Sequence, residues 1–413
     1  GKFHQKSRPE QPFRQFHYLD ALSRTLNPAV ATALQENPQL TAATEEPQKQ
    51  RWASLDQFRG YTVLGMFLVN FVGSYAVVKS QLPLLSHHNT YCSYADTIMP
   101  QFFFAVGFSF RLTYLRRRER EGTLSAVRHA VARNFALLVV AFFVHQLDGK
   151  YASWESLRDA GALEVLLGAF RKSYFQTLTH IALASLWILP VIGRSFSARA
   201  GYAIFSAVLF HILSHFGYYE WVTGSAGGID GGVLGFMSWS LPVLMGTFAY
   251  DWAAEDRAAS IRKMLFFGGA VMLLGYALSC LNRVTPPNTP NGWLDYFVEP
   301  PFMPPSKPVN IWTMSQKAGA ISYMLFGGGF SMALFPLFVA ACDLGTRRLG
   351  VFRTLGVNAL AGYILHDLVN ATIKPFVPKD SPLWWVSAGC ALSLLICYAC
   401  LRHMEKRRVF LQL

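Results

Sequence analysis

The sequence is built around apolar runs about as long as the hydrocarbon core of a bilayer is thick. The first two cover residues 61–78 and 97–115. An α-helix needs roughly 20 apolar residues to cross a membrane. Further runs lie at 134–147, 177–193, 201–217, 233–250, 264–281, 319–342, 355–373 and 383–401. The pattern predicts an all-α polytopic integral membrane protein with about ten transmembrane helices in one bundle.

The composition agrees with this prediction. Apolar residues make up 52% of the 413 residues and charged residues only 15%, whereas a soluble chain carries about 25% charged residues. The net charge of +13 could indicate a nucleic-acid partner, but the basic residues cluster beside the apolar runs, as membrane topology requires. We therefore expect the lipid bilayer as a partner and no nucleic acid.

The distribution of Lys and Arg orients the chain. A dense basic segment at 111–133 follows the second apolar run, and the positive-inside rule makes it cytoplasmic. If the runs alternate in direction, the later inside connections are also basic, whereas the outside connections at 218–232 and 282–318 are lean in Lys and Arg. The connection at 148–176 fits least well. We expect a protein of the plasma (inner) membrane with both termini in the cytoplasm.

The polar residues 1–50 are expected to form a loosely ordered cytoplasmic tail before a transmembrane domain at 51–413. Ser54, followed by Gln57, fits a capping box that opens the first membrane helix. Arg59 then either meets an anionic group at the membrane surface or simply anchors the helix on the inner side.

Several motifs carry a family resemblance. The string LDQFRG at 55–60, the later Asn70, a histidine followed by Asp96, and a downstream Pro, Phe-rich run and Gly resemble the heparan-α-glucosaminide N-acetyltransferase family of membrane acetyltransferases. Weaker echoes lie at 176–186, 308–315 (PVNIWTMS) and 355–368 (LGVNALAGYILHDL). The resemblance spans the chain after about residue 50. It implies an enzyme that takes acetyl-CoA from the cytosol and acetylates an amino sugar or other glycan on the outer face.

Acetyl transfer needs a base for the proton of the acceptor and a donor for the oxyanion. His87 or His88, in the first outer loop, could be that base with Asp96 as its carboxylate partner, and Asn70 could be the amide donor. The histidine could equally carry the acetyl group as a nucleophile. The bland interpretation is a polar loop with Asp96 as the N-cap of the second span. The spacing differs from the family pattern, so the choice between the two histidines stays open.

The resemblance also suggests how substrates bind. Arg59 and Arg111 would bind the phosphates of the acyl-CoA, and Asn358 and His366 would contact its pantetheine arm, with hydrogen bonds between helices as the alternative role. The expected acceptor-binding residues are Asp230, Asn310, Trp312 and His180. Because adjacent residues on a helix do not face each other, His366 and Asp367 are not expected to pair.

Other motifs predict less chemistry. His211 and His215 share a helix face but have no third ligand nearby, so we expect no metal site. The glycines of FGGGF at 326–330 are expected to pack helices closely rather than bind phosphate. A transporter is the alternative function, with a proton or solute path through Asn70, His145, His366 and Asp367. A non-catalytic scaffold is a third, and a homodimer is left open.

Overall fold

The computed structural model describes residues 52–88, 90–145, 153–169, 174–224, 229–281 and 309–411. The chain divides into two units, Gly1–Trp52 and Ala53–Leu413, and the second is described here. Its described residues form helices and turns without a strand. The tail expected at 1–50 and most of the loop expected at 282–318 lie outside the described residues.

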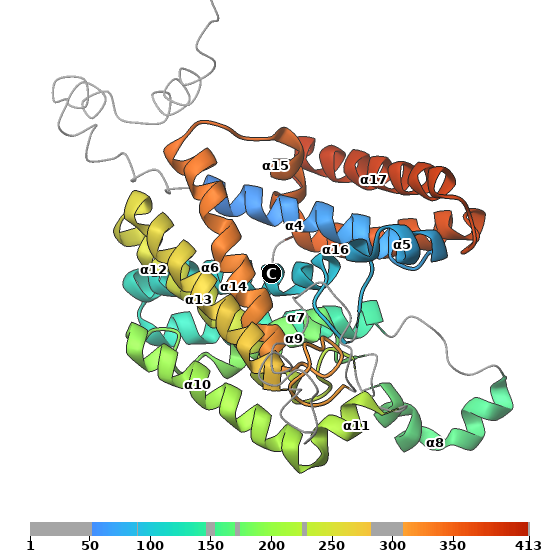
Figure 1. Ribbon diagram of the computed structural model, residues 1–413, viewed down its shortest axis with the longest axis horizontal. Helices are drawn as coiled ribbons and strands as arrows, with labels where there is room; N and C mark the ends of the chain where they lie inside the picture. The colour runs from blue at the N-terminus through green and yellow to red at the C-terminus, as the bar shows by residue number, and fades with distance from the viewer. Residues whose placement is uncertain are drawn as a thin grey trace, which may run out of the picture. The chain divides into compact units, whose positions relative to one another are not determined.

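The long helices pack side by side as one bundle (Figure 1). They are α4 (Ala53–Val72), α6 (Tyr94–Glu121), α7 (Thr123–His145), α9 (Thr177–Trp187), α10 (Phe196–Leu213), α12 (Gly235–Glu255), α13 (Arg257–Cys280), α14 (Ile321–Phe338), α16 (Ala359–Ile373) and α17 (Leu383–Lys406). Single residues, Gly122 and Asp256, separate α6 from α7 and α12 from α13. Such short connections force neighbouring helices to run antiparallel.

Five helical segments within the described ranges are long and apolar enough to cross a membrane. They are Thr123–Val144, Phe196–Thr223, Arg257–Cys280, Ile321–Leu344 and Leu383–Lys406. The other predicted runs give helices that carry charged groups, such as Arg59 in α4 and Asp251 in α12, or that are short or interrupted. The structure therefore supports an all-α chain with several apolar helices, and the number of about ten spans remains a prediction.

Several predicted boundaries were wrong. Helix α4 begins at Ala53, next to the expected start at Ser54, but it ends at Val72, and a separate short helix, α5 (Ala76–Gln81), covers the end of the run predicted at 61–78. The connection at 148–176 contains the helix α8 (Trp154–Ala169). The run at 355–373 is split between α15 (Gly350–Val357) and α16, because Asn358 leaves the helical conformation with φ −120° and ψ 36°.

The capping box expected at Ser54 and Gln57 is also wrong, because both side chains bond to a distant segment instead. The Ser54 hydroxyl donates to Asp343 Oδ2 (2.5 Å), and the backbone N–H of Ser54 donates to Oδ1 (3.1 Å). Gln57 donates to the carbonyl of Leu349 (3.0 Å) and accepts from its N–H (2.9 Å). These polar groups therefore tie the start of α4 to the connection between α14 and α15.

Glycines set the closest helix crossings. A Cβ at Gly107 of α6 would lie 1.8 Å from the carbonyl oxygen of Val243 on α12, and one at Gly246 would lie 2.0 Å from the carbonyl oxygen of Phe104. On α14, a Cβ at Gly329 would lie 2.7 Å from the carbonyl oxygen of Gly268 on α13. Such contacts allow no side chain at all. The close-packing role predicted for the FGGGF segment is thus confirmed.

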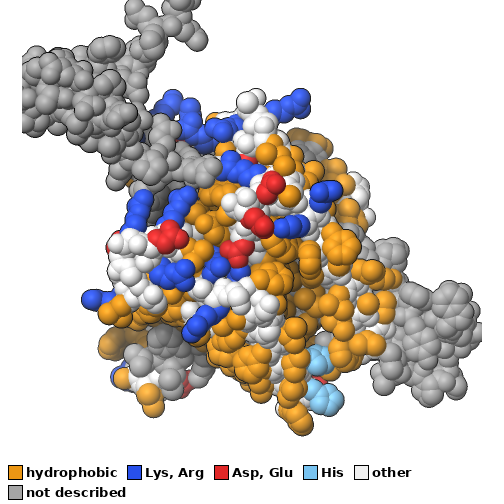
Figure 2. Space-filling view, turned by 90° about the vertical axis from the view of Figure 1, so that its left-hand side faces the viewer, with side chains coloured by type: hydrophobic (Ala, Val, Ile, Leu, Met, Phe, Trp, Pro, Cys, Tyr) orange, Lys and Arg blue, Asp and Glu red, His pale blue; other side chains and the backbone are white. Residues whose placement is uncertain are grey.

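The two ends of the bundle differ in charge. The face seen from the left of Figure 1 carries Lys and Arg side chains over its upper half and hydrophobic side chains below (Figure 2). Along the chain, basic residues occur in the connections at 256–257 and 345–349 and at the end of α17. The polar site described next lies at the other end, where α6, α9 and α12 begin and α4 ends.

Candidate functional site

A polar cavity of about 200 Å³ lies between α4, α6, α9 and α16. An adjoining, more open cavity of about 560 Å³ shares four of its residues, Val69, Asn70, His87 and Asp367. The side chains of Asn70 and His87 therefore face both spaces. The loops before α12 and α14 close the far wall with Asp230 and Gln316.

Asp96 anchors the site from the first turn of α6. Ser93 is the N-cap of this helix, and Asp96 completes a capping box, accepting from the backbone N–H of Ser93 (2.9 Å). The other carboxylate oxygen lies 3.0 Å from His87 Nδ1, while the Asp96 residue is only 1% exposed. Asp96 thus takes part in capping, as Ser93's partner rather than as the N-cap, and it also orients a histidine.

The structure separates the two candidate histidines. His87 lines both cavities, and its side chain is 45% exposed. His88 lines neither: its ring stacks on Tyr91 with centroids 4.1 Å apart, and its Nε2 lies 2.9 Å from the carbonyl of Pro83 and 2.8 Å from the Tyr91 hydroxyl. Of the two histidines, His87 is the one that lines the cavities.

A chain of polar contacts determines which ring nitrogens of His366 and His87 carry protons. Since the carbonyl of Tyr363 accepts from His366 Nδ1–H, the Nε2 of a neutral His366 is an acceptor, and it takes a hydrogen bond from the amide nitrogen of Asn70 (3.0 Å). The Asn70 oxygen then faces His87 Nε2 (3.4 Å). With Asp96 accepting from Nδ1–H, a neutral His87 presents its Nε2 lone pair to the cavity. Protonation at Nε2 would create a donor to Asn70.

This arrangement changes the role expected for Asn70. Its amide nitrogen, predicted to be the oxyanion donor, is engaged by His366, and its oxygen is the group nearest His87. The amide oxygen is therefore placed to accept a hydrogen bond from His87 whenever Nε2 carries a proton.

His366 and Asp367 come into contact, which the sequence argument did not expect, but they form an ion pair only when His366 is protonated. The neutral His366 described above, whose Nε2 accepts from Asn70, has no proton to donate to Asp367. His366 Nε2 lies 3.2 Å from Asp367 Oδ1. The argument considered helix faces only, and the short aspartate side chain can bend back toward its neighbour at the rim of the cavity. Lys374 continues the polar rim and donates to the backbone carbonyl of Asn70 (2.9 Å).

Asp230 forms the opposite wall of the cavity. It is 8% exposed and adopts a left-handed backbone conformation, with φ 56°, in the loop before α12. Gln316 donates to its Oδ1 (2.9 Å), and Trp239 donates to its backbone carbonyl (2.8 Å). Burial raises the pKa of the Asp230 carboxyl to about 6, against the opposing effect of the Gln316 hydrogen bond and the nearby His87.

The two predicted phosphate-binding arginines lie away from this cavity. Arg111 forms a forked contact with Asp251, at 3.0 and 3.3 Å, and also donates to the carbonyl of Ile192. Arg59 donates to the hydroxyl of Ser109. The guanidinium of Arg111 is thereby occupied by protein groups.

The residues predicted to bind the pantetheine arm and the acceptor do not all lie at one site. Only His366 and Asp230 line the cavity. Asn358 and His180 are each fully buried, and no hydrogen bond satisfies the side-chain polar atoms of Asn358. Asn310 accepts from the N–H of Trp312 (2.9 Å) in a local turn.

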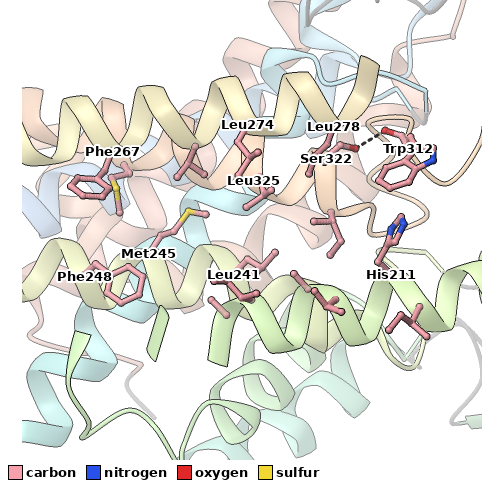
Figure 3. A pocket seen from close by; sticks show the side chains of 18 of the residues that line it. His211, Leu241, Met245, Phe248, Phe267, Leu274, Leu278, Trp312, Ser322 and Leu325 are labelled. Atoms are coloured by element: carbon pink, nitrogen blue, oxygen red, sulfur yellow. Dashed lines mark hydrogen bonds between the residues drawn. The ribbon is translucent and has the colours of Figure 1, made fainter. Parts of the chain in front are cut away.

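Trp312 belongs to a different pocket. Its ring lies 4.3 Å from that of His211, centroid to centroid, at one end of an apolar groove of about 420 Å³ between α10, α12, α13 and α14 (Figure 3). The groove continues past Leu241 and Leu325 to Phe248 and Phe267.

Sequence reasoning missed Gln316 and Lys374. Gln316 lies one position beyond the PVNIWTMS string, and it, rather than Asn310, reaches Asp230. Lys374 directly follows the apolar helix α16. The signal available in both cases was a polar side chain next to the end of an apolar run.

No protein-family model matches the sequence, and no curated protein is significantly similar to it. Across the described ranges, no group of three or more His, Cys, Asp or Glu side chains is placed to hold a metal ion. The chemistry of the site must therefore be argued from its geometry.

Proposed function

We propose that the chain is an integral membrane acyltransferase of the heparan-α-glucosaminide N-acetyltransferase type, which moves an acetyl or other acyl group from acyl-CoA to an amino sugar or other glycan. The observation that carries the proposal is the Asp96–His87 pair, whose Nε2 faces a polar cavity with Asp230 on its far wall. A buried carboxylate, an oriented imidazole and open space at its second nitrogen are what a general base requires.

In the proposed reaction the acceptor nitrogen or oxygen attacks the thioester carbonyl. His87 Nε2 takes the proton of the acceptor, and Asp96 and Asn70 stabilise the imidazolium. As the C–S bond breaks, the same proton passes to the departing thiolate, so His87 returns to its neutral form. The charged carboxylate of Asp230 suits the ammonium group of an amino sugar when it binds. The ammonium must first lose one proton to solvent, and the neutral amine is then the group that attacks. Transient acylation of His87 is an alternative course with the same overall balance.

An acyl-CoA needs protein groups that can bind its phosphates and its pantetheine arm. Arg111 does not fit a phosphate-binding role, because Asp251 and a backbone carbonyl already occupy it. On the basic segment, Arg120 and Arg128 are exposed, and a phosphate group could reach them. The unsatisfied amide of Asn358, buried between α15 and α16, is suited to a polar arm that passes toward the cavity.

The membrane placement belongs to the same proposal. About ten spans with both termini in the cytoplasm of a plasma membrane would put the basic connections inside and the His87 cavity outside. The helix directions support this assignment, since α4 ends at the cavity whereas α6, α9 and α12 begin there. Donor and acceptor would then approach the cavity from opposite sides.

The test is acetyl-CoA consumption by the purified, detergent-solubilised protein with a panel of amino sugars. The wild type should release CoA only when an acceptor is present. His87→Ala should lose this activity while His88→Ala keeps it. Failure of the wild type to bind or consume any acyl-CoA would remove the acyltransferase proposal.

A transporter is the second candidate, favoured by one observation. Polar contacts continue from His87 through Asn70 to His366, Asp367 and Lys374, and a relay of this kind can carry protons. The fourth residue of the path expected from the sequence, His145, has a side chain outside the described part of the chain. Uptake into sealed liposomes without any CoA would support this candidate.

A further inference from the structure

A second pocket at the basic end of the bundle combines an apolar groove with two arginines. It has a volume of about 460 Å³ and lies between α4, α14, the π-helical turn Val339–Leu344 and α15. Its apolar lining includes Tyr61, Leu337 and Phe352. Arg347 and Arg348 lie at its rim.

The two arginines are exposed at the surface. Among the residues that the structure describes, neither guanidinium makes an ion pair or a side-chain hydrogen bond. Among the described acidic residues, Asp343 lies four positions before Arg347 and accepts from Ser54, and Glu405 pairs with Arg353 at 3.3 Å. The groove lining thus carries two exposed guanidiniums that form no ion pair within the described part of the chain.

The turn that presents these arginines is held in place. Both hydrogen bonds of the Gln57 amide end on Leu349, and the N–H of Arg347 donates to the carbonyl of Ala341 (3.0 Å). Beside it, the backbones of α4 and α15 touch: a Cβ at Gly60 would lie 1.8 Å from the carbonyl oxygen of Phe352. The backbone that carries the two arginines is therefore held in place before a ligand binds, which lowers the cost of binding.

The groove opens sideways along the bundle. Leu337 is 62% exposed and Leu349 59% exposed, so in a membrane this side would face lipid. Helix α14 and its π-helical extension end at Leu344, three residues before Arg347, which puts the arginine pair at the level of lipid head groups. A phosphate meeting both guanidiniums, with an acyl chain along the apolar wall, would satisfy the two halves of the pocket.

We propose that this groove binds one anionic phospholipid of the inner leaflet, with its phosphate on Arg347 and Arg348 and an acyl chain against Leu337 and Phe338. The site rests on the membrane placement under "Proposed function" but not on acyl transfer. It would tie the connection between α14 and α15 to the membrane surface.

The test is retention of phosphatidylglycerol by the purified protein, measured by native mass spectrometry and by titration in neutral phosphatidylcholine nanodiscs. R347Q/R348Q should weaken binding roughly thirtyfold, at about fivefold for each arginine near an anionic surface. R407Q/R408Q removes the same charge at the end of α17, outside the groove, and should change binding less than twofold. Equal losses in both double variants would reduce the site to general surface charge and overturn the proposal.

A second pair of variants tests the groove and keeps every charge. Ala341→Trp fills it, whereas Ala340→Trp adds the same ring at a neighbouring exposed position that does not line it. Only Ala341→Trp should reduce lipid retention. Unaltered retention in Ala341→Trp would contradict the proposal.

Competition identifies the source of the phosphate. Inorganic phosphate should not displace the lipid, because it lacks the apolar tail, and neither should acetyl-CoA. Displacement by inorganic phosphate would make the site a simple anion site, and displacement by acetyl-CoA would make it part of the donor site. A protein that fails to enter nanodiscs at all would instead contradict the membrane placement, and acyl-CoA turnover reports separately on acyl transfer.

Discussion

The two ends of α6 and α12 hold polar clusters built on opposite principles. Toward the basic end, Arg111 and Arg199 share the carboxylate of Asp251, and the Arg199 side chain is completely buried. At the other end, His87 bonds to the buried Asp96 but leaves its Nε2 lone pair facing a cavity. In the first cluster the charged side chains pair with one another, which stabilises the bundle. In the second cluster the Nε2 of His87 is left facing the cavity, where a ligand can reach it.

The difference shows why the presence of an arginine is a poor guide to binding. A buried guanidinium needs acceptors whether or not a ligand exists, and Arg111 finds Asp251 and a carbonyl oxygen within the fold. A half-exposed histidine has no such need. Substitutions at the two ends should therefore affect different properties.

The largest effect is expected at His87. His87→Ala removes the proposed base and should lower acyl transfer roughly a thousandfold while the melting temperature changes little, because the side chain is half exposed. Steady-state CoA release together with thermal unfolding measures both. His88→Ala is the matched control. If it alone abolished turnover, the assignment of the two histidines would be reversed.

Asp251→Asn should act on stability instead. It leaves two buried guanidiniums without a carboxylate and should cost about 3 kcal/mol of unfolding free energy. Glu255 lies one turn after Asp251 on α12 and forms an exposed ion pair with Lys263. Glu255→Gln breaks this pair and should lower the unfolding free energy by less than about 0.5 kcal/mol. Thermal unfolding in detergent compares them. Normal stability in Asp251→Asn would show that the cluster is not a structural clamp.

Asn70→Ala should have an intermediate effect. It removes the acceptor for a protonated His87 and the donor to His366, so we expect turnover to fall by about ten- to thirtyfold. The loss should appear in kcat more than in KM, since the amide acts on the charged form of the histidine. Asn134→Ala, a buried asparagine on α7 that bonds within its own helix, should leave both constants unchanged; a similar loss there would point to general destabilisation.

The smallest effect concerns Asp230 and pH. Its pKa of about 6 lies above the ordinary value of 3.8, so between these values the folded chain keeps a proton that the unfolded chain has lost. Its contribution to stability therefore falls as pH rises from about 4 to 6 and is constant above. Asp230→Asn should remove this slope from the melting temperature.

The same variant tests the acceptor. Above pH 6 the carboxylate can pair with an amino sugar, so Asp230→Asn should raise KM about tenfold at pH 7.5 and far less at pH 5. Asp159→Asn, an exposed aspartate on α8, controls for both measurements. If the difference in stability between the wild type and Asp230→Asn did not change with pH, the raised pKa of Asp230 would be contradicted.

Local rules explain which parts of the site could be predicted. The pairing of a loop histidine with Asp96 follows from helix initiation, because Ser93 and Asp96 form a capping box that leaves one carboxylate oxygen for the loop. The choice of His87 over His88 does not follow, since it depends on Tyr91 and Pro83 holding the second ring. Likewise, Gln316 reaches Asp230 across 86 positions of sequence, a separation that no spacing rule covers.

Apolar runs, turn residues and charge asymmetry are properties of sequence alone, and they determined the helical class, the apolar helices, the basic end of the bundle and the close packing of FGGGF. The tertiary structure alone decided which polar groups meet. Hydrogen bonds depend on distances of about 3 Å between atoms far apart along the chain, and only packing sets those distances. For that reason Arg111 forms an ion pair with Asp251, while His87, Asn70 and His366 come together.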